Sequence, residues 1–347
     1  MKKQILLLLL VFLSACSLPQ NISTKLIETK GKISSDNYLG SYYKDNYVWG
    51  GAMNLAWNDL NENILHEKIQ LDTKDKTALE MVTKLNESPF NKNDLDEASY
   101  YIKSGYGQET VNIINQESRQ KFPSKSLKDL DIGLGPEDII AYAYFLKEVE
   151  YQNQFEEKNV TFQNDSVKGF YAINYKQRNN IKILKYWDDD KFIISLQLKN
   201  DDDQLFLAKG FSDTSPKTVI DLINSLNNSE NLSEINSEDL FEMPKIHLDY
   251  QRKYNELTNK SLANKDFTDY YIGEIYENIK FDMDHKGARV ENEAAITVIA
   301  GAINPQKKPK VRKFILDKPF WVIMKRANST NPYFILGINN TALLETQ

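Results

Sequence analysis

The stretch LDKPFWVIMKRANSTNPYFILGINN, Leu316 to Asn340, combines two apolar runs with a short polar connection. The two runs, KPFWVIMKR and PYFILGINN, are rich in aromatic and β-branched residues and have the length of strands. The connection between them has the polar composition of a turn. The chain is therefore predicted to close with two strands.

Further strands are predicted upstream of this stretch. IIAYAYF, residues 139–145, is a continuous apolar run, which is typical of a strand buried on both faces of a large sheet. Acidic triplets at 188–190 and 201–203 lie between strands, and we interpret both as solvated hairpin turns rather than calcium sites. The other predicted strands are IKILKYW (181–187), FIISLQL (192–198), LFLAKGF (205–211), PKIHLDY (244–250) and IKFDM (279–283).

Helices are predicted mainly in the first third of the chain. Apolar residues recur at helical spacing from Met53 to Ile64, so residues 49–65 are predicted as an amphipathic helix. Thr77 and Glu80 have the spacing of a capping box that opens a second helix. Further helices are predicted at 108–121, after Pro216, and at 254–263. Helices first and strands later indicate an α+β fold with a large central β-sheet.

The composition limits the chemistry of the protein. The 347 residues include 16 Phe, 19 Tyr and one Cys, which predicts a packed core without disulfides. A formal net charge of -6 disfavours nucleic acid as a partner. His66, His247 and His285 lack the spacing of metal ligands, and no hydrolase or nucleotide-binding signature occurs. We therefore predict no catalytic residue, no metal and no other cofactor.

The first twenty residues have the pattern of an export signal. Two lysines precede the apolar run from Ile5 to Leu13, and LSAC at 13–16 resembles the lipobox of bacterial lipoproteins. Removal of residues 1–15 would leave Cys16 as a lipidated N-terminus and change the net charge from -6 to -8. The alternative is a buried Cys in an N-terminal core helix. Ser17, rather than Asp, follows the Cys, which by the same resemblance indicates the outer membrane of the cell envelope.

Three parts of the chain are predicted from these patterns. Residues 1–15 form a lipoprotein signal peptide, and residues 16–47 form a polar, lipidated tether. Residues 48–347 form a single domain, because no repeat or change of composition divides them. The protein is expected to be a monomer that contacts the membrane through its lipid alone.

The order of several segments resembles the serpin family of protease-trapping proteins. The resemblance covers roughly residues 108–345, whereas the chain before Gln108 is shorter than in the family. It implies a serpin-like α+β fold, with a large central β-sheet, further sheets and an exposed C-terminal reactive loop. The matching segments, in family order, are IIAYAYFLKEVEYQNQF (139–155), VKGF (167–170), IKILKYWDDDKFIISLQL (181–198), MPKIHLDY (243–250) and the closing stretch 316–340.

A serpin's reactive loop is cut by a protease and then inserts into the main sheet as an extra strand. The resemblance places the loop after IKFDMDHKG, with its hinge at Gly287, Ala288, Val290 and Ala294. The alternate residues from 288 to 300 would then face the core, and six of these seven are apolar. Their set is Ala288, Val290, Asn292, Ala294, Ile296, Val298 and Ala300.

Two other interpretations of this segment stay open. Residues 288–303 could already form a paired strand, since an apolar strand pattern alone does not distinguish the two states. An alternative alignment matches Glu293-Ala294-Ala295 with the family's hinge motif. The Gly287 register is preferred because it gives the alternation without gaps.

The bond that a protease would cut is predicted by counting along the loop. Counting forward from the hinge leads to Gly301, Ala302 and Ile303, among small apolar residues that suit an elastase-like protease. Counting backward from Pro319 leads to Lys307 and Lys308, which suit a trypsin-like protease, although Pro309 hinders cleavage after Lys308. The forward count is preferred, because the hinge side determines how far the inserted strand extends.

The predicted function is that of a lipid-anchored, serpin-like serine protease inhibitor that traps its target by loop insertion. The alternative is a non-inhibitory serpin-like lipoprotein that serves as a binding scaffold at the envelope. A third possibility is a lipoprotein of unrelated α+β fold.

Overall fold

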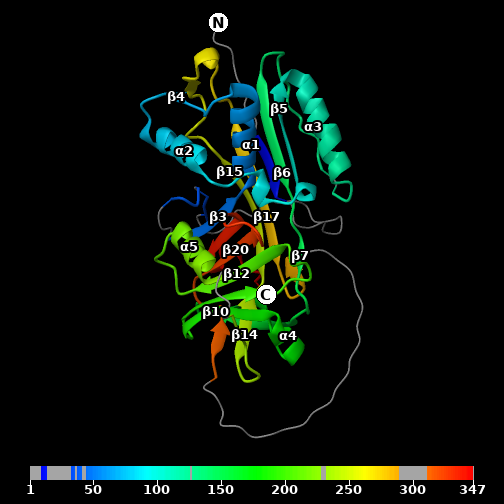
Figure 1. The fold of residues 1–347 in the computed structure, drawn as a ribbon, viewed down its shortest axis with the longest axis vertical. Coiled ribbons are helices and arrows are strands. Elements are labelled where there is room, and N and C mark those ends of the chain that lie inside the picture. Colours follow the sequence, from blue (N-terminus) through cyan, green and yellow to red (C-terminus); the bar gives the residue numbers. More distant parts are fainter. Residues whose placement is uncertain are drawn as a thin grey trace.

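The computed structural model describes residues 9–13, 33–35, 37–40, 44–125, 127–227, 232–288 and 311–346. These residues form three main β-sheets, and α1, α2 and α3 surround the five-stranded one (Figure 1). Two short strand pairs complete the sheets, β4 (Leu71–Asp72) with β16 (Ser261–Leu262) and β7 (Val149–Glu150) with β18 (Gly287–Ala288).

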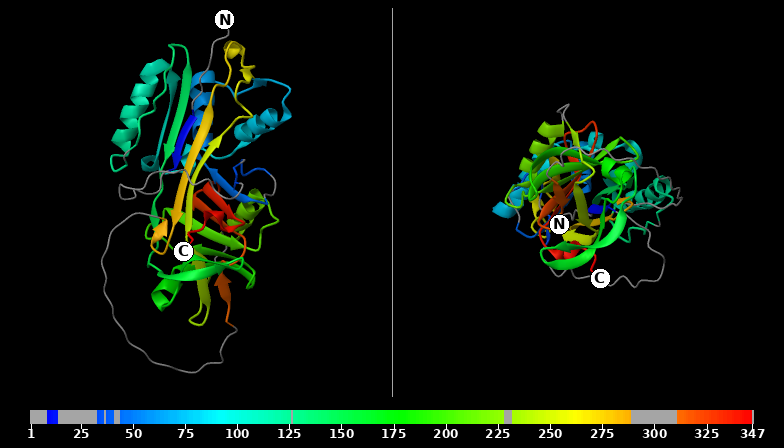
Figure 2. Two further views of the ribbon diagram at one scale, coloured as in Figure 1. Left: turned by 180° about the vertical axis from the view of Figure 1, so that it is seen from behind. Right: turned by 90° about the horizontal axis from the view of Figure 1, so that it is seen from below.

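The five-stranded sheet lies in the upper half of the molecule, where β15 and β17 run along the long axis (Figure 2). Its outer strands are antiparallel to their neighbours, whereas β1 runs parallel to both β17 and β6. The strands, in spatial order, are β15 (Ile246–Lys253), β17 (Ile275–Met283), β1 (Leu9–Leu13), β6 (Ile139–Phe145) and β5 (Tyr100–Tyr106).

Strand β6 is buried on both faces, as its continuous apolar sequence predicts. Ala143 belongs to the main core, and β6 packs there against helix α1 (Ala52–Leu60). Tyr144 belongs to a second, smaller core that includes Val111 of helix α3 (Gly107–Lys121). A strand enclosed between two helices has no solvated face, so the alternation of polar and apolar residues is lost.

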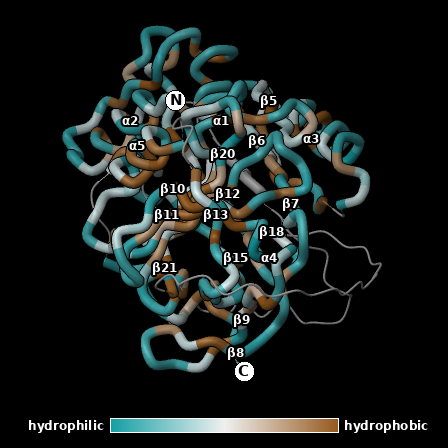
Figure 3. Tube along the Cα trace, turned by 60° about the horizontal axis from the view of Figure 1, so that its bottom comes forward, coloured by the Kyte–Doolittle hydropathy of each residue, from teal (hydrophilic) through white to brown (hydrophobic). Residues whose placement is uncertain are grey.

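The eight-stranded sheet contains the two strands that the closing stretch predicts, β20 and β21, and both are almost entirely buried. Figure 3 shows hydrophobic residues gathered along the strands at the centre of the molecule and hydrophilic residues around its outside. The strands, in spatial order, are β13 (Ser233–Glu234), β10 (Ile181–Asp188), β11 (Lys191–Leu196), β12 (Asp203–Lys209), β20 (Phe320–Arg326), β21 (Pro332–Ile338), β3 (Asn46–Gly50) and β2 (Ile33–Ser34).

The four-stranded sheet carries the chain segment that follows the predicted reactive loop. Its first strand, β19, runs parallel to β14, and the remaining pairs are antiparallel. The strands, in spatial order, are β19 (Lys313–Ile315), β14 (Leu240–Pro244), β9 (Asp165–Tyr171) and β8 (Glu156–Phe162).

The remaining helices start where local sequence signals favour them. Helix α2 (Lys76–Glu87) is capped by Asp75, whose carboxylate accepts from the backbone N–H groups of Thr77 and Ala78, so the predicted cap at Thr77 was two residues late. Helix α5 begins at Pro216, where the missing N–H is not needed. Helix α5 ends at Asn227 (Pro216–Asn227), and the short helix α4 spans Tyr175–Asn179. A π-helical turn (Asn61–Leu65) extends α1.

The helix predicted at 254–263 is wrong. The backbone N–H of Tyr254 donates to Ile275 O (2.9 Å), and that of Asn259 donates to Ile272 O (2.7 Å). Asn259 also has a φ of 61°, in the left-handed region. Bonds to a neighbouring segment satisfy the backbone here, and they replace the bonds of a helix.

The packed core includes residues that the sequence analysis assigned to the tether. Tyr38 is buried and meets Trp49 edge-on, with ring centroids 4.7 Å apart. Strands β2 and β3 also begin before residue 48. Among the helices that the structure describes, none has the length and hydrophobicity to cross a bilayer.

Candidate functional site

The middle of the five-stranded sheet contains a slot between β6 and β17, two parallel strands that are joined only through β1. Leu9–Leu13 pairs with residues 275–279 of β17, and Val11–Leu13 pairs with residues 143–145 of β6. A β-strand occupies about 4.8 Å of sheet width, so β6 and β17 stand one strand apart. The sheet is therefore built to hold an additional strand at its centre.

The inward face of β17 is apolar except at one position. Ile279, Phe281 and Met283 are buried, as alternate residues of a strand with one face on the core. Glu277 has the same parity and is 2% exposed. Glu277 lies in the same alternation as the apolar residues Ile279 and Phe281, so the sequence already indicated that its side chain faces the core.

Burial dominates the chemistry of Glu277. Its Oε2 accepts from the hydroxyl of Tyr254 (2.8 Å), and the backbone N–H of Met53 also interacts with the carboxyl group. Desolvation raises the pKa of Glu277 to about 7, although the Tyr254 hydroxyl and the charge of Arg252 act in the opposite direction. The core face of β17, beside the slot, thus contains a buried carboxyl group whose pKa is raised.

The predicted hinge lies at the end of the slot next to the carboxyl end of β17, and it already reverses the chain. The backbone N–H of Asp284 donates to Gly287 O (3.0 Å), so His285 and Lys286 form a two-residue turn after β17. Gly287 and Ala288 then pair with Glu150 and Val149 of β7 as strand β18. The chain therefore leaves the hinge in the direction opposite to β17.

The turn is held by the segment that follows β6. His285 O accepts from the backbone N–H of Phe155 (2.8 Å), and Lys286 O accepts from that of Tyr151 (3.1 Å). The His285 ring lies 3.1 Å from the Glu157 carboxylate. These contacts fix where the loop begins.

Only glycine fits at the hinge position that the sequence predicts. Gly287 has a φ of +154°, and a Cβ atom there would lie 2.4 Å from Val149 O and 2.7 Å from the Glu150 Cα. Ala288 follows it and is 4% exposed. Its side chain lines a small cavity with Phe145, Phe281 and Phe334, at the hinge end of the slot.

The far end of the loop is held by a separate group of charges. The Arg312 guanidinium donates to Asp239 Oδ2 through Nε (3.0 Å) and Nη2 (2.6 Å), and Asp239 is 1% exposed. The Arg312 carbonyl accepts from the backbone N–H of Leu240 (3.0 Å). The backbone N–H of Arg312 donates to the other oxygen, Asp239 Oδ1 (2.8 Å), so both oxygens of the carboxylate hold this residue.

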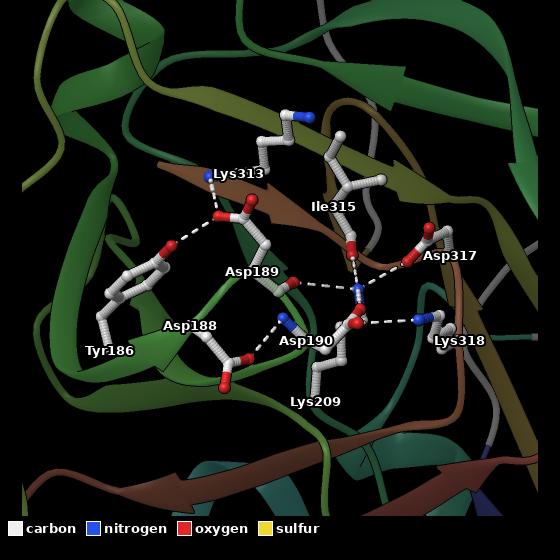
Figure 4. Close-up of polar contacts among 9 residues, drawn as sticks. All are labelled: Tyr186, Asp188, Asp189, Asp190, Lys209, Lys313, Ile315, Asp317 and Lys318. Carbon is white, nitrogen blue, oxygen red and sulfur yellow. Dashed lines mark hydrogen bonds and ion pairs between the residues drawn. The ribbon is translucent and has the colours of Figure 1, made fainter. Parts of the chain in front are cut away.

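Buried Lys209 joins this end of the loop to the β10–β11 hairpin (Figure 4). Its ammonium group donates to Ile315 O (2.8 Å), Asp317 Oδ1 (2.5 Å) and Asp189 O (3.1 Å). Asp190 adds an ion pair at 3.2 Å. Three donors on one ammonium group are thus satisfied, which a buried lysine requires.

One residue of each acidic triplet, Asp189 and Asp203, contacts a distant strand. Asp203 is 5% exposed, and it binds Lys147 Nζ (2.8 Å) and accepts from the Tyr333 hydroxyl (3.1 Å). Asp189 accepts from the backbone N–H of Lys313 (3.0 Å). The interpretation of the triplets as turns is confirmed for Asp188, Asp190, Asp201 and Asp202, which are exposed. Asp203 departs from it, because it begins β12 and is buried against partners from distant strands. Among the described residues, no group of three His, Cys, Asp or Glu could hold a metal ion.

The structure places two of the predicted site residues, Gly287 and Ala288, in β18. The others lie outside the described residues, namely Cys16, Val290, Ala294, Gly301, Ala302, Ile303, Lys307 and Lys308. Sequence reasoning missed Glu277, Lys209 and the Arg312–Asp239 pair.

Comparisons with known proteins bear on the fold. No protein-family model and no curated protein sequence matches the chain. Similar solved structures include the mouse protein Z-dependent protease inhibitor, at 13% identity and a TM-score of 0.53 over 85% of this chain and 91% of that one. Thyroxine-binding globulin in complex with thyroxine is 12% identical, with a TM-score of 0.51 over 87% of this chain and 93% of its own. Serpin48 of the insect Tenebrio molitor is 13% identical, with a TM-score of 0.47 over 86% and 92%.

These likenesses span most of the chain, and with the three-sheet architecture they show a serpin-like α+β fold. The prediction of the fold class is confirmed.

Replacing Gly287 with Ala is expected to lower the free energy of unfolding by about 1–3 kcal/mol, because the new Cβ collides with the β7 backbone. Denaturant unfolding measures the change. Gly133→Ala is the control, since a Cβ there meets no atom within 4 Å. Equal stability of the two variants would contradict the pairing of β18 with β7.

Glu277→Gln is expected to remove a pH dependence of stability. The pKa of Glu277 is raised from 4.5 to about 7 in the folded protein, so its contribution is fully present below pH 4.5 and is lost as the pH rises through 7. The wild-type protein should therefore lose on the order of 3 kcal/mol relative to the variant between pH 4.5 and pH 8. Urea unfolding of both proteins across this range measures it, and parallel curves would show that Glu277 is not buried.

Proposed function

We propose that this protein is a serpin-like serine protease inhibitor whose loop, residues 289–310, inserts into the slot between β6 and β17 after cleavage. The observation that carries the proposal is the combination of a one-strand slot with a hinge that has already turned toward it. The protein would act once, as a trap, rather than as an enzyme that turns over.

The turn at the hinge determines the register of the inserted strand. Pairing of Asp284 with Gly287 puts Ala288 opposite Met283, and continuation of this register puts Ala294 opposite Glu277. The inward residues of the loop then meet the buried residues of β17, while Arg289, Glu291 and Glu293 lie on the other face.

The same register supplies a partner for the single polar residue of the inward set. Asn292 would lie opposite Ile279 and diagonal to Glu277, a separation of about 7–8 Å between Cα atoms that an amide and a carboxyl side chain can bridge. Glu277 is buried beside this position, and one of its carboxyl oxygens would accept from the Asn292 amide. Satisfying both groups would remove a penalty of about 1–3 kcal/mol for each one left unpaired.

The two ends of the loop have different parts in trapping. The hinge end moves into the slot, whereas Arg312 and Lys209 hold the other end on the four-stranded sheet. After cleavage, the segment acylated to the protease would travel with the hinge end. The preferred cleavage region is Gly301, Ala302 and Ile303, which favours an elastase-like protease, with Lys307 and Lys308 and a trypsin-like protease as the alternative.

A binding scaffold without inhibition is the second candidate. The neighbour thyroxine-binding globulin was solved with thyroxine, so this fold also serves a binding protein.

Attachment at the cell envelope belongs to the same proposal. Lipidation at Cys16 would hold the acidic domain at a membrane, and the outer membrane is expected from Ser17. The polar residues after Cys16 would separate the domain from the lipid surface.

Incubation with elastase is expected to give an SDS-resistant complex and, for the cleaved protein, a higher melting temperature, because the sheet gains a strand. Ala294→Arg should abolish both by burying a charge, whereas Glu293→Arg, on the solvated face, should not. Mass spectrometry of the released fragment locates the cut at Ala302 or Ile303. Nicked protein that melts no higher than intact protein would support the scaffold instead.

Cys16→Ser is expected to yield unprocessed, unlipidated protein, because the thiol accepts the diacylglycerol. Labelling of cells with radioactive palmitate measures lipidation, and Ser17→Ala is the control that keeps the thiol. A labelled Cys16→Ser protein would contradict the lipoprotein assignment.

A further inference from the structure

The slot between β6 and β17 is occupied by an apolar segment of the chain itself. We propose that this slot is a binding site for Leu9–Leu13, and that the chain is blocked for loop insertion as long as this segment stays attached. The inference rests on the proposed function for its second half only, since occupancy of the slot is independent of protease trapping.

The backbone pairing carries the first half of the proposal. Strand β1 is parallel to both neighbours, and its register runs from Leu9 opposite Ile275 to Leu13 opposite Ile279 and Phe145. The segment reads LLVFL, a continuous apolar run of the kind that fills a strand position buried on both faces. The chemical class of the ligand is therefore a short, extended, apolar peptide.

The position of β1 leaves residues 280–283 at the hinge end of β17 without a partner from β1. Strand β1 ends opposite Ile279, and the small cavity beyond it is lined by Phe145, Phe281 and Ala288. A loop entering from the hinge in the register above would reach Ile279 with Asn292 and then meet β1. Insertion would stop after about two inward residues, Ala288 and Val290, because two strands cannot share one position in the ladder.

Processing of the N-terminus would then control the inhibitor. The segment Leu9–Leu13 belongs to residues 1–15, which are removed when Cys16 becomes the N-terminus in the proposed lipoprotein. Cleavage before Cys16 would empty the slot and allow the loop to enter. The unprocessed chain would leave proteases untouched, and the processed chain would trap them.

Occupancy is tested by disulfide cross-linking of the full chain, purified without export. In a Cys16→Ser background, which lacks other cysteines, Val11→Cys with Ala143→Cys pairs two adjacent residues. The control, Val11→Cys with Ile102→Cys, is at the same level but one strand further away. We expect mild oxidation to join the first pair and not the second; equal cross-linking of both, or of neither, would overturn the proposal.

The block is tested by the rate of elastase trapping. The chain 16–347 and the full chain with Val11→Asp, which places a charge in the slot, should both trap at least about tenfold faster than the full wild-type chain. Val11→Ile, which keeps the segment apolar, should trap as slowly as the wild-type chain. Equal rates for all four proteins would overturn the block. Cross-linking without trapping by any of them would reject the proposed function and still support the binding site.

Discussion

The structure depends on a constraint of backbone hydrogen bonding at the centre of the five-stranded sheet. Strands β6 and β17 are parallel and stand one strand apart, so the polar backbone groups along their facing edges need a third strand. Buried N–H and C=O groups without partners are costly, and a slot of this kind strongly favours any extended segment that fits. The identity of that segment determines the state of the molecule.

The residues on both sides of segment 289–310 are held in place by specific contacts. At the hinge, the contact of Gly287 with the β7 backbone leaves no room for a side chain, and the two-residue turn directs the chain back along β17. At the other end, Arg312 and Lys209 bind acceptors from three separate segments.

Polar groups in the core fix this arrangement more than apolar packing does. Apolar contacts are tolerant of small shifts, whereas Lys209 and Asp203 must meet particular acceptors and donors or remain unpaired at a cost of several kcal/mol. Glu277 is held less completely, because burial outweighs its hydrogen bond to Tyr254 and raises its pKa to about 7.

The strands β6, β20 and β21 and the glycine at the hinge can be predicted from the sequence alone. The alternation along β17 also indicates which of its side chains face the core. These features follow from local periodicity and from the conformational freedom of one residue, both of which can be read over a few positions. The pairing of Leu9–Leu13 with β17, the burial of Lys209 and the Arg312–Asp239 contact were decided only by the tertiary structure. Each of them joins residues far apart along the chain. The spacing of residues in the sequence does not indicate which distant polar groups will be buried together and hydrogen-bonded.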